Sequence, residues 1–248
     1  MDDLLQPLAA AGAPRTAHEV VADLRLHAEL PVGRPRVVAV MIASADGRAA
    51  VRGRSTPLGH PADRSLLRTL REHADAVLVG TGTLRAEGYA NMLDPDQRAR
   101  RVRDGRPPLP EVATVTRSFD VPTAIGLFAE TDAKVRVYTA AGGEVAARGA
   151  RVEVHALGDE LGLPAVLAHL RAEAGVRSVA CEGGPRLLRA LAAARCVDDL
   201  LLTVAPLLVA GDEVTALRGP ALDPPAELQL AGVGRAGSHV FLHFRAAR

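Results

Sequence analysis

Three apolar segments of this sequence end in the same way, in a short run of glycine, hydroxyl and carboxylate residues. They are Val37 to Ala49 (VVAVMIASADGRA), Asp75 to Thr83 (DAVLVGTGT) and Ser178 to Pro185 (SVACEGGP). Short apolar runs bounded by such residues are typical of buried strands. In an open α/β sheet, ligands bind beyond the carboxyl ends of the strands. The sequence therefore predicts an α/β fold with a nucleotide or cofactor site at that edge of the sheet.

Size and composition favour one α/β domain. The chain has 248 residues, 48% hydrophobic and 24% charged, which is enough for one large domain or two small ones. A net charge of +1 gives no reason to expect nucleic acid or an anionic membrane as a partner. The two cysteines, Cys181 and Cys196, form neither a disulfide framework nor a metal-ligand pattern. We therefore expect no bound metal. Because no export signal and no membrane-spanning apolar run is visible, we also expect a cytoplasmic protein.

The chain is expected to form an N-terminal arm, residues 1–35, and one domain, residues 36–248. The arm holds a weakly amphipathic stretch, Ala17 to Leu30, which is expected to form a helix packed on the domain or on a second subunit. Helices and strands then alternate, which favours a parallel sheet. After the first strand we predict a helix beginning at Pro61, strands Asp75–Val79, Val112–Thr116, Val135–Thr139 and Val152–His155, helix Pro164–Ala174, strand Ser178–Cys181 and helix Pro185–Ala194.

Two further segments complete the predicted organisation. The last strands, Leu200–Val209, Glu227–Val233 and His239–Arg245, have no helices between them, which predicts an antiparallel finish. The segment Asp94 to Pro110 is charged and proline-rich, and is predicted to be an exposed, disordered loop.

Each motif at a strand end has a chemical and a structural interpretation. Gly183-Gly184 precedes a helix opened by Pro185, so free N–H groups there suit a diphosphate, although a tight turn would also use glycines. Gly80-Thr81-Gly82-Thr83 departs from the GxGxxG pattern and is weak evidence alone. Glu182 would point away from a diphosphate, toward donors on a substrate, or else cap a loop. Asp46, close to Ser44, either faces the site or only forms a turn.

Together these residues resemble the reductase domain of bacterial riboflavin biosynthesis, a family with the dihydrofolate reductase fold. The matching segments are Ser44-Ala45-Asp46-Gly47, Leu70-Arg71, Asp75 to Thr83, Glu182-Gly183-Gly184, Val197-Asp198-Asp199 and Ala205-Pro206-Leu207-Leu208. They follow the family's order and spacing from about Arg36 to the C-terminus. The resemblance implies a mostly parallel central sheet flanked by helices with antiparallel C-terminal strands. It also implies a homodimer that uses NADPH to reduce the ribose C1′ of 5-amino-6-(5-phosphoribosylamino)uracil.

The resemblance assigns a role to individual residues. Asp46 and Glu87 are predicted to be catalytic, and Ser44, Arg71 and Glu182 to bind substrate. Gly80, Gly82, Thr83, Gly183 and Gly184 are predicted to bind the cofactor, with Arg117 and Ser118 at its 2′-phosphate. The planar guanidinium of Arg71 suits an anionic substrate group, while an exposed helix arginine is as common an interpretation. No histidine stands out as a proton donor, which leaves water near Asp46 or Glu87 as a source.

The sequence departs from the pathway enzymes between Ala86 and Leu93. They read Ala-Asp-Asn-Pro and then Leu-Thr-Val-Arg, whereas this chain has Ala-Glu-Gly-Tyr and Ala-Asn-Met-Leu, so the arginine expected near the substrate phosphate is missing. This form resembles a stand-alone actinobacterial branch of pyrimidine reductases. No deaminase motif, H-x-E followed by P-C-x-x-C, is present, so the chain is expected to perform the reduction at most.

Two alternatives remain open from the sequence. One is a reductase of a pterin or dihydrofolate-type ring on the same scaffold. The other is a nucleotide-binding module without turnover, which could hold nucleic acid through an arginine cluster. That cluster, Arg98, Arg100, Arg101, Arg103 and Arg106, lacks interleaved aromatic residues and contains acidic ones, so a solvated loop is the better interpretation.

Overall fold

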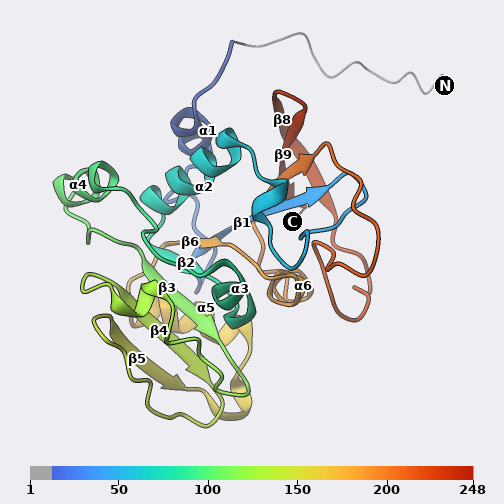
Figure 1. Cartoon of the computed structure of the whole chain (residues 1–248). Helices are drawn as coiled ribbons and strands as arrows, with labels where there is room; N and C mark the ends of the chain where they lie inside the picture. Colours follow the sequence, from blue (N-terminus) through green and yellow to red (C-terminus); the bar gives the residue numbers. More distant parts are fainter. Residues whose placement is uncertain (1–12, 248) are drawn as a thin grey trace, which may run out of the picture.

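A mixed sheet forms the centre of the computed structural model, which describes residues 13–247 (Figure 1). Within that part of the chain the strand order is β5-β4-β3-β2-β6-β1-β7-β9-β8. The strands are β1 (Arg36–Ser44), β2 (Ala76–Leu78), β3 (Glu111–Val115), β4 (Lys134–Thr139), β5 (Arg151–Ala156), β6 (Ser178–Cys181), β7 (Asp199–Ala205), β8 (Leu228–Ala236) and β9 (His239–Ala246). The helices are α1 (Ala17–Asp23), α2 (Pro61–His73), α3 (Thr81–Glu87), α4 (Pro95–Arg103), α5 (Leu163–Ala172) and α6 (Pro185–Ala193).

The predicted α/β class with a mostly parallel sheet is confirmed. Every neighbouring pair from β5 to β7 is parallel, and the β7–β9 and β9–β8 pairs are antiparallel. The predicted antiparallel finish is confirmed in the β7–β9 and β9–β8 pairs, and β7 joins it to the rest of the sheet by pairing in parallel with β1. The strand ends at Ala205 rather than Val209, since Pro206 follows and has no N–H to donate.

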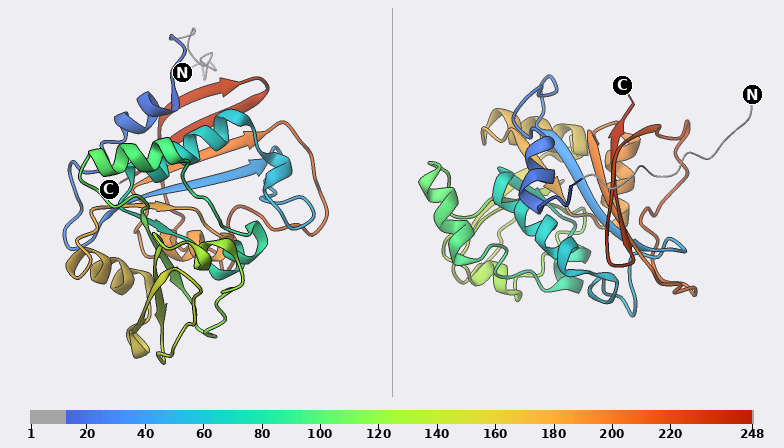
Figure 2. Two further views of the ribbon diagram at one scale, coloured as in Figure 1. Left: turned by 60° about the vertical axis from the view of Figure 1, so that its left-hand side comes forward. Right: turned by 90° about the horizontal axis from the view of Figure 1, so that it is seen from above.

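Helices cover both faces of the sheet (Figure 2). On one face α1 and α2 bury Val21, Leu66 and Leu70, and on the other α5 and α6 bury side chains that include Leu167 and Leu188. Burying a leucine completely stabilises the fold by about 1.5–3 kcal/mol, so the apolar side chains on one face of each helix account for its packing against the sheet. No helix among residues 13–247 is both long and apolar enough to cross a bilayer.

The helix predicted over Ala17–Leu30 is shorter than expected. Thr16 and Glu19 form a capping box at its start, and α1 ends at Asp23. The chain then turns through positive φ at Arg25 (47°) and Glu29 (50°), which a helix cannot include. The arm remains packed, because α1 lies against α2 and Leu24 is 1% exposed. Residues 1–12 of the predicted arm lie outside the described residues.

The prediction of a disordered loop over Asp94–Pro110 is wrong, because most of this segment forms α4. The helix begins with a capping box between Asp94 and Gln97, followed by Pro95 at its first position. Three of its arginines, Arg98, Arg100 and Arg101, are held by tertiary partners. Arg101 is 1% exposed and donates to the Glu72, Ala74 and Pro107 carbonyl oxygens at 2.7, 2.8 and 2.8 Å. The composition of a segment does not reveal such partners, so charge was mistaken for disorder.

Candidate functional site

The three polar strand ends predicted to share a site lie at one edge of the sheet. Strand β6 pairs in parallel with both β1 and β2, so the carboxyl ends of these strands are neighbours. Ser44 is the last residue of β1, Gly80 lies just beyond β2, and Glu182 directly follows β6. The parallel pairing of these strands therefore brings the predicted residues to the same edge of the sheet, each at or directly after the end of its own strand.

The glycines beyond β2 and β6 contact each other. The Gly80 N–H donates to the Gly183 carbonyl oxygen at 2.8 Å. A Cβ at Gly184 would lie 2.7 Å from Thr83 Oγ1, and one at Gly183 (φ 78°) would lie 3.0 Å from Met41 Sδ. Four predicted cofactor residues thus form one compact unit, called the glycine cradle below: Gly80, Thr83, Gly183 and Gly184.

The start of α6 adds a feature that suits phosphate. Gly184 is its N-cap and supplies no side-chain hydrogen bond, and Pro185 takes the first helical position. The first N–H groups of a helix have no partner within it, and they attract anions. Gly82 is exposed in the first turn of α3, with nothing within 4 Å of where its Cβ would be, so a ligand could approach the backbone there.

Arg71, Glu182 and Tyr89 form a buried polar cluster beside the cradle. Arg71 donates to Glu182 through two bonds, Nε to Oε1 and Nη2 to Oε2, both 2.6 Å. The Tyr89 hydroxyl donates to Oε2 at 2.5 Å, and Arg71 Cζ lies 5.2 Å from the Tyr89 ring centroid. The Glu182 side chain is 3% exposed. Within this cluster the Glu182 carboxylate therefore receives three hydrogen bonds.

The electrostatics of the cluster fix its protonation. Burial and the Glu182 carboxylate raise the pKa of Tyr89 well above its usual value, so the phenol stays a donor. Burial alone would lower the pKa of Arg71, but Glu182 raises it, so the guanidinium stays charged. Arg71 and Glu182, both predicted to meet substrate, are thus paired with each other. Tyr89 was part of the noted departure from the pathway enzymes, but the sequence gave no sign of its contact with Glu182.

Ser44, Asp46 and Glu87 mainly hold loops at this edge. Asp46 accepts from Ser44 Oγ at 2.5 Å and from the Val209 and Ala210 N–H groups at 3.1 and 2.7 Å. These bonds lower the pKa of Asp46 to about 2, which makes it a poor proton donor at neutral pH. Glu87 Oε1 accepts from the Ser55 N–H at 2.9 Å. Their predicted catalytic roles remain predictions.

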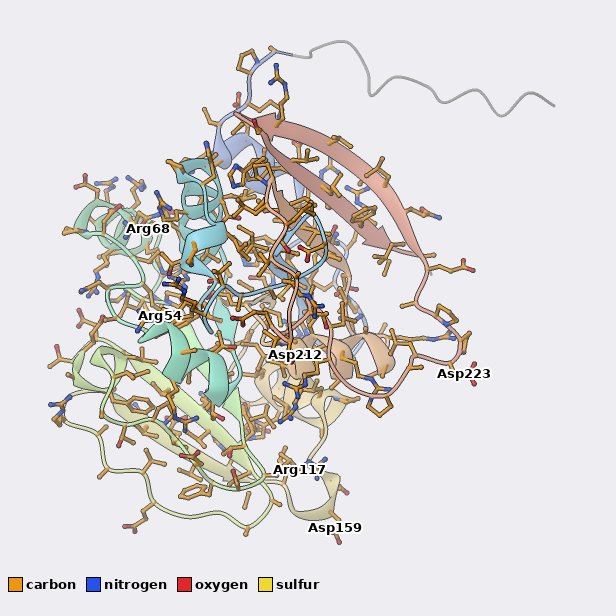
Figure 3. The ribbon with its side chains drawn as sticks, turned by 45° about the vertical axis from the view of Figure 1, so that its right-hand side comes forward. Arg54, Arg68, Arg117, Asp159, Asp212 and Asp223 are labelled. Atoms are coloured by element: carbon orange, nitrogen blue, oxygen red, sulfur yellow. The ribbon has the colours of Figure 1, made fainter. Side chains whose placement is uncertain are left out.

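Arg117 and Ser118 are exposed just beyond β3, whose carboxyl end is beside that of β2. Arg117 Nη2 lies 3.4 Å from the Leu161 carbonyl oxygen, its one recorded hydrogen bond among the described residues. Figure 3 shows Arg117 at the end of the molecule where Asp159 also lies, well away from Arg68. A weakly held arginine can turn toward a ligand at little cost. Within residues 13–247, no group of three His, Cys, Asp or Glu residues is arranged to hold a metal.

Comparison with known sequences identifies relatives over most of the chain. The family model described as RibD C-terminal domain matches residues 35–242. Riboflavin biosynthesis protein RibD of Bacillus amyloliquefaciens is 31% identical over 206 residues, 81% of this chain and 53% of that protein. The chain thus spans about half the length of this relative. The 2,5-diamino-6-ribosylamino-4(3H)-pyrimidinone 5′-phosphate reductase of Archaeoglobus fulgidus is 31% identical over 183 residues, 72% of this chain and 83% of that protein.

Solved structures show the same fold. A pyrimidine reductase-like protein from Corynebacterium diphtheriae has a TM-score of 0.75 and 23% identity, covering 94% of this chain and all of that one. Acinetobacter baumannii RibD has a TM-score of 0.68 and 18% identity, covering 88% of this chain and 59% of that one. At these identities the likeness establishes the fold.

Proposed function

Because the chain belongs to the RibD C-terminal domain family, we propose that it is a cytoplasmic reductase of riboflavin biosynthesis that uses NADPH. Its substrate in this proposal is 5-amino-6-(5-phosphoribosylamino)uracil or a close pyrimidine relative. The observation that carries the proposal is the glycine cradle at the carboxyl edge of the sheet, next to the buried carboxylate Glu182. Backbone exposed by glycine beside a helix N-terminus suits a dinucleotide diphosphate.

The residues of the chain divide the work as follows in this proposal. The cradle and Gly82 hold the cofactor, and Arg117 with Ser118 receives its 2′-phosphate. When bound, the reduced nicotinamide supplies a hydride. Ser44, Arg71 and Glu182 border the substrate, and Asp46 and Glu87 keep the surrounding loops in place.

A second candidate, reduction of a pterin or dihydrofolate-type ring, has one observation in its favour. The charge of Arg71 is balanced by Glu182, in a bidentate pair whose arginine side chain is 12% exposed. A balanced pair attracts a phosphate less than a free arginine does, so the site also suits a neutral heterocycle. Even if the phosphorylated substrate is used, we expect its binding to be weak.

We further propose that the protein is a homodimer formed through one face of the β7–β9–β8 sheet. The pairing register places apolar residues on the same face of all three strands: Leu200, Leu202, Val204, Val240, Leu242, Phe244, Leu228, Leu230 and Val233. None of these nine residues is fully buried, and Leu230 is 53% exposed. An apolar face of this kind on a soluble domain marks an interaction surface, and a second copy presents the same face.

The function is tested by following the absorbance of reduced nicotinamide. We expect oxidation of NADPH when purified protein is mixed with 5-amino-6-(5-phosphoribosylamino)uracil, and slower oxidation of NADH. Dihydrofolate is the matched comparison for the second candidate. Oxidation of NADPH with dihydrofolate but not with the aminopyrimidine would replace the first function by the second. Equal rates of oxidation of NADH and NADPH would contradict the assignment of Arg117 to the 2′-phosphate. Binding of NADPH without any turnover would support the non-catalytic alternative.

A further inference from the structure

Arg68 of α2 is an exposed arginine whose guanidinium has no partner within residues 13–247. Gln97 Nε2 donates to Arg68 at 3.3 Å, but this bond goes to the backbone carbonyl oxygen and leaves the side chain free. On the same helix Arg71 is instead paired with Glu182. A guanidinium presents five N–H donors in a planar fork that matches phosphate or carboxylate oxygens. Arg68 is therefore available to an anion from outside the chain.

A hollow of about 460 Å³ lies beside Arg68. Its lining comes from α2, from the segment before α4 and from α4 itself, and consists of Arg68, Asn91, Leu93, Asp94, Pro95 and Arg98. Figure 3 shows Arg68 at the surface, on the side of α2 that faces α4. The volume of the hollow is within the range of small-molecule sites, so it can hold one end of a ligand.

The hollow adjoins the buried polar cluster of the candidate site. Arg71 Nη1 lies 3.5 Å from the carbonyl oxygen of Met92, which stands in the chain between two residues that line the hollow. Arg68 precedes Arg71 by three residues, so the two side chains are neighbours on the helix surface. At its other end the cluster meets the glycine cradle, because Glu182 directly precedes Gly183. Cradle, cluster and hollow thus follow one another, and a ligand that lies along the cluster reaches Arg68.

The charges around the hollow leave Arg68 as the unbalanced cation among the residues that line it. Arg98 is paired with Glu130, because its Nη2 donates to Oε2 at 2.8 Å. Asp94 is the carboxylate of the lining, and its Oδ1 accepts from the Gln97 N–H at 2.8 Å in the capping box of α4. The helix N-terminus stabilises the charge of this carboxylate. The attraction of the hollow for an anion therefore comes from Arg68.

We propose that Arg68 binds the anionic group at the end of the substrate that lies away from its heterocyclic ring. This inference rests on the proposed reductase function and adds a specificity-determining residue to the same site. Both candidate substrates end in such a group, the phosphate of the aminopyrimidine and the carboxylates of the glutamyl tail of dihydrofolate. A guanidinium binds either group through two parallel N–H···O bonds. Because Glu182 balances the charge of Arg71, Arg68 is the residue that distinguishes an anionic substrate from a neutral one with the same ring.

The test uses the full chain with saturating NADPH and two forms of the aminopyrimidine, with and without the 5′-phosphate. Arg68→Gln keeps a polar end on the side chain but removes its charge. We expect its KM for the phosphorylated form to rise about ten-fold, the scale of one lost hydrogen bond to a charged group, while its KM for the unphosphorylated form and its kcat for both forms stay within about two-fold. Arg68→Lys keeps the charge without the fork and should recover part of the loss. Arg103→Gln, an exposed position of α4 outside the lining, should change neither KM.

Dihydrofolate and a dihydropterin without the glutamyl tail form a second pair of substrates. If Arg68→Gln raises KM only for the phosphorylated aminopyrimidine, the bound group is a phosphate, and if it raises KM only for dihydrofolate, the bound group is a carboxylate. Added salt should raise the KM of the anionic substrate more in the unmodified protein than in Arg68→Gln, because salt screens the attraction between exposed charges.

Two outcomes separate the failure of this inference from the failure of the proposed function. Turnover of an anionic substrate with a KM that Arg68→Gln does not change would overturn the role of Arg68 and leave the reductase function standing. If the unmodified protein oxidises NADPH with none of the four compounds, the reductase function fails. Calorimetric titration of the phosphorylated aminopyrimidine into the protein with NADPH then decides on Arg68, and equal affinities of the unmodified and Arg68→Gln proteins would overturn its role as well.

Discussion

At the scale of single residues, Glu182 joins three parts of the site. Its carboxylate accepts from Arg71 of α2 and from Tyr89, which follows α3, while its backbone begins the turn that contains Gly183 and Gly184. Removing one partner of a buried ion pair leaves an uncompensated charge, which commonly destabilises a protein by several kcal/mol. The position of the glycine cradle therefore depends on side chains that need not touch the cofactor.

The Tyr89 hydroxyl offers a direct test of this dependence. Tyr89→Phe keeps the ring beside Arg71 but removes one of the hydrogen bonds to Glu182. We expect a loss of about 1.5–3 kcal/mol in the free energy of unfolding, measured by urea denaturation, because the acceptor is charged. NADPH binding should weaken with it. Tyr138→Phe, which removes a bond of 3.1 Å to His169, is the matched control and should cost only about 0.5–1.5 kcal/mol. An equal loss of unfolding free energy in the two variants would show that the bond from Tyr89 to the Glu182 carboxylate is no stronger than an ordinary hydrogen bond.

At the scale of elements, α4 shows where sequence interpretation failed. The capping pattern Asp94-Pro95-Asp96-Gln97 is a local helix signal, but the dense charge and the later prolines pointed to a loop. What makes the helix stable is its contact with α2. Gln97 and Arg100 bond to Glu72, and Arg101 bonds to the last carbonyls of α2. These partners are 25 to 29 residues away along the chain, so no local pattern reveals them.

We therefore predict that Arg101 anchors the end of α2 from which Arg71 projects. Burial lowers the pKa of Arg101 to about 10, so it is still charged at neutral pH. Arg101→Met fills similar space but leaves buried carbonyl oxygens without a donor, and should lower the free energy of unfolding by at least about 2 kcal/mol. Arg103→Met, an exposed position on the same helix, should change it by less than about 0.5 kcal/mol. If denaturant curves show the two variants to be equally stable, α4 does not anchor α2 through this side chain.

At the scale of the whole molecule, the sequence could predict where strands end but not which strands meet. Apolar runs that stop at glycine and carboxylate residues correctly placed Ser44, Gly80 and Glu182 at strand ends. The insertion of β1 between β6 and β7, and the pairing of Arg71 with Glu182 across 111 residues, depend on the order of strands in the sheet. Alternation of helices and strands is compatible with several such orders. The hydrogen bond from Thr203 Oγ1 of β7 to Asp63 Oδ1 of α2 was missed for the same reason, since the two residues are 140 residues apart.

The apolar face of β7, β9 and β8 leads to a prediction about the assembly. Strand β8 is at the edge of the sheet, and its one charged residue, Arg235, lies near the end of the strand as the register partner of Val240, so most of the edge and of this face is not protected by charge. We expect the unmodified protein to be a dimer in sedimentation equilibrium. Leu230→Asp places a carboxylate on the apolar face, where contact with a second copy would bury it without a partner, and should shift the protein to a monomer. Val102→Asp is the matched control, because Val102 is 56% exposed on α4 and lies outside this face, so that variant should stay dimeric. A monomeric unmodified protein, or a dimer that survives Leu230→Asp, would show that this face does not join two copies of the chain.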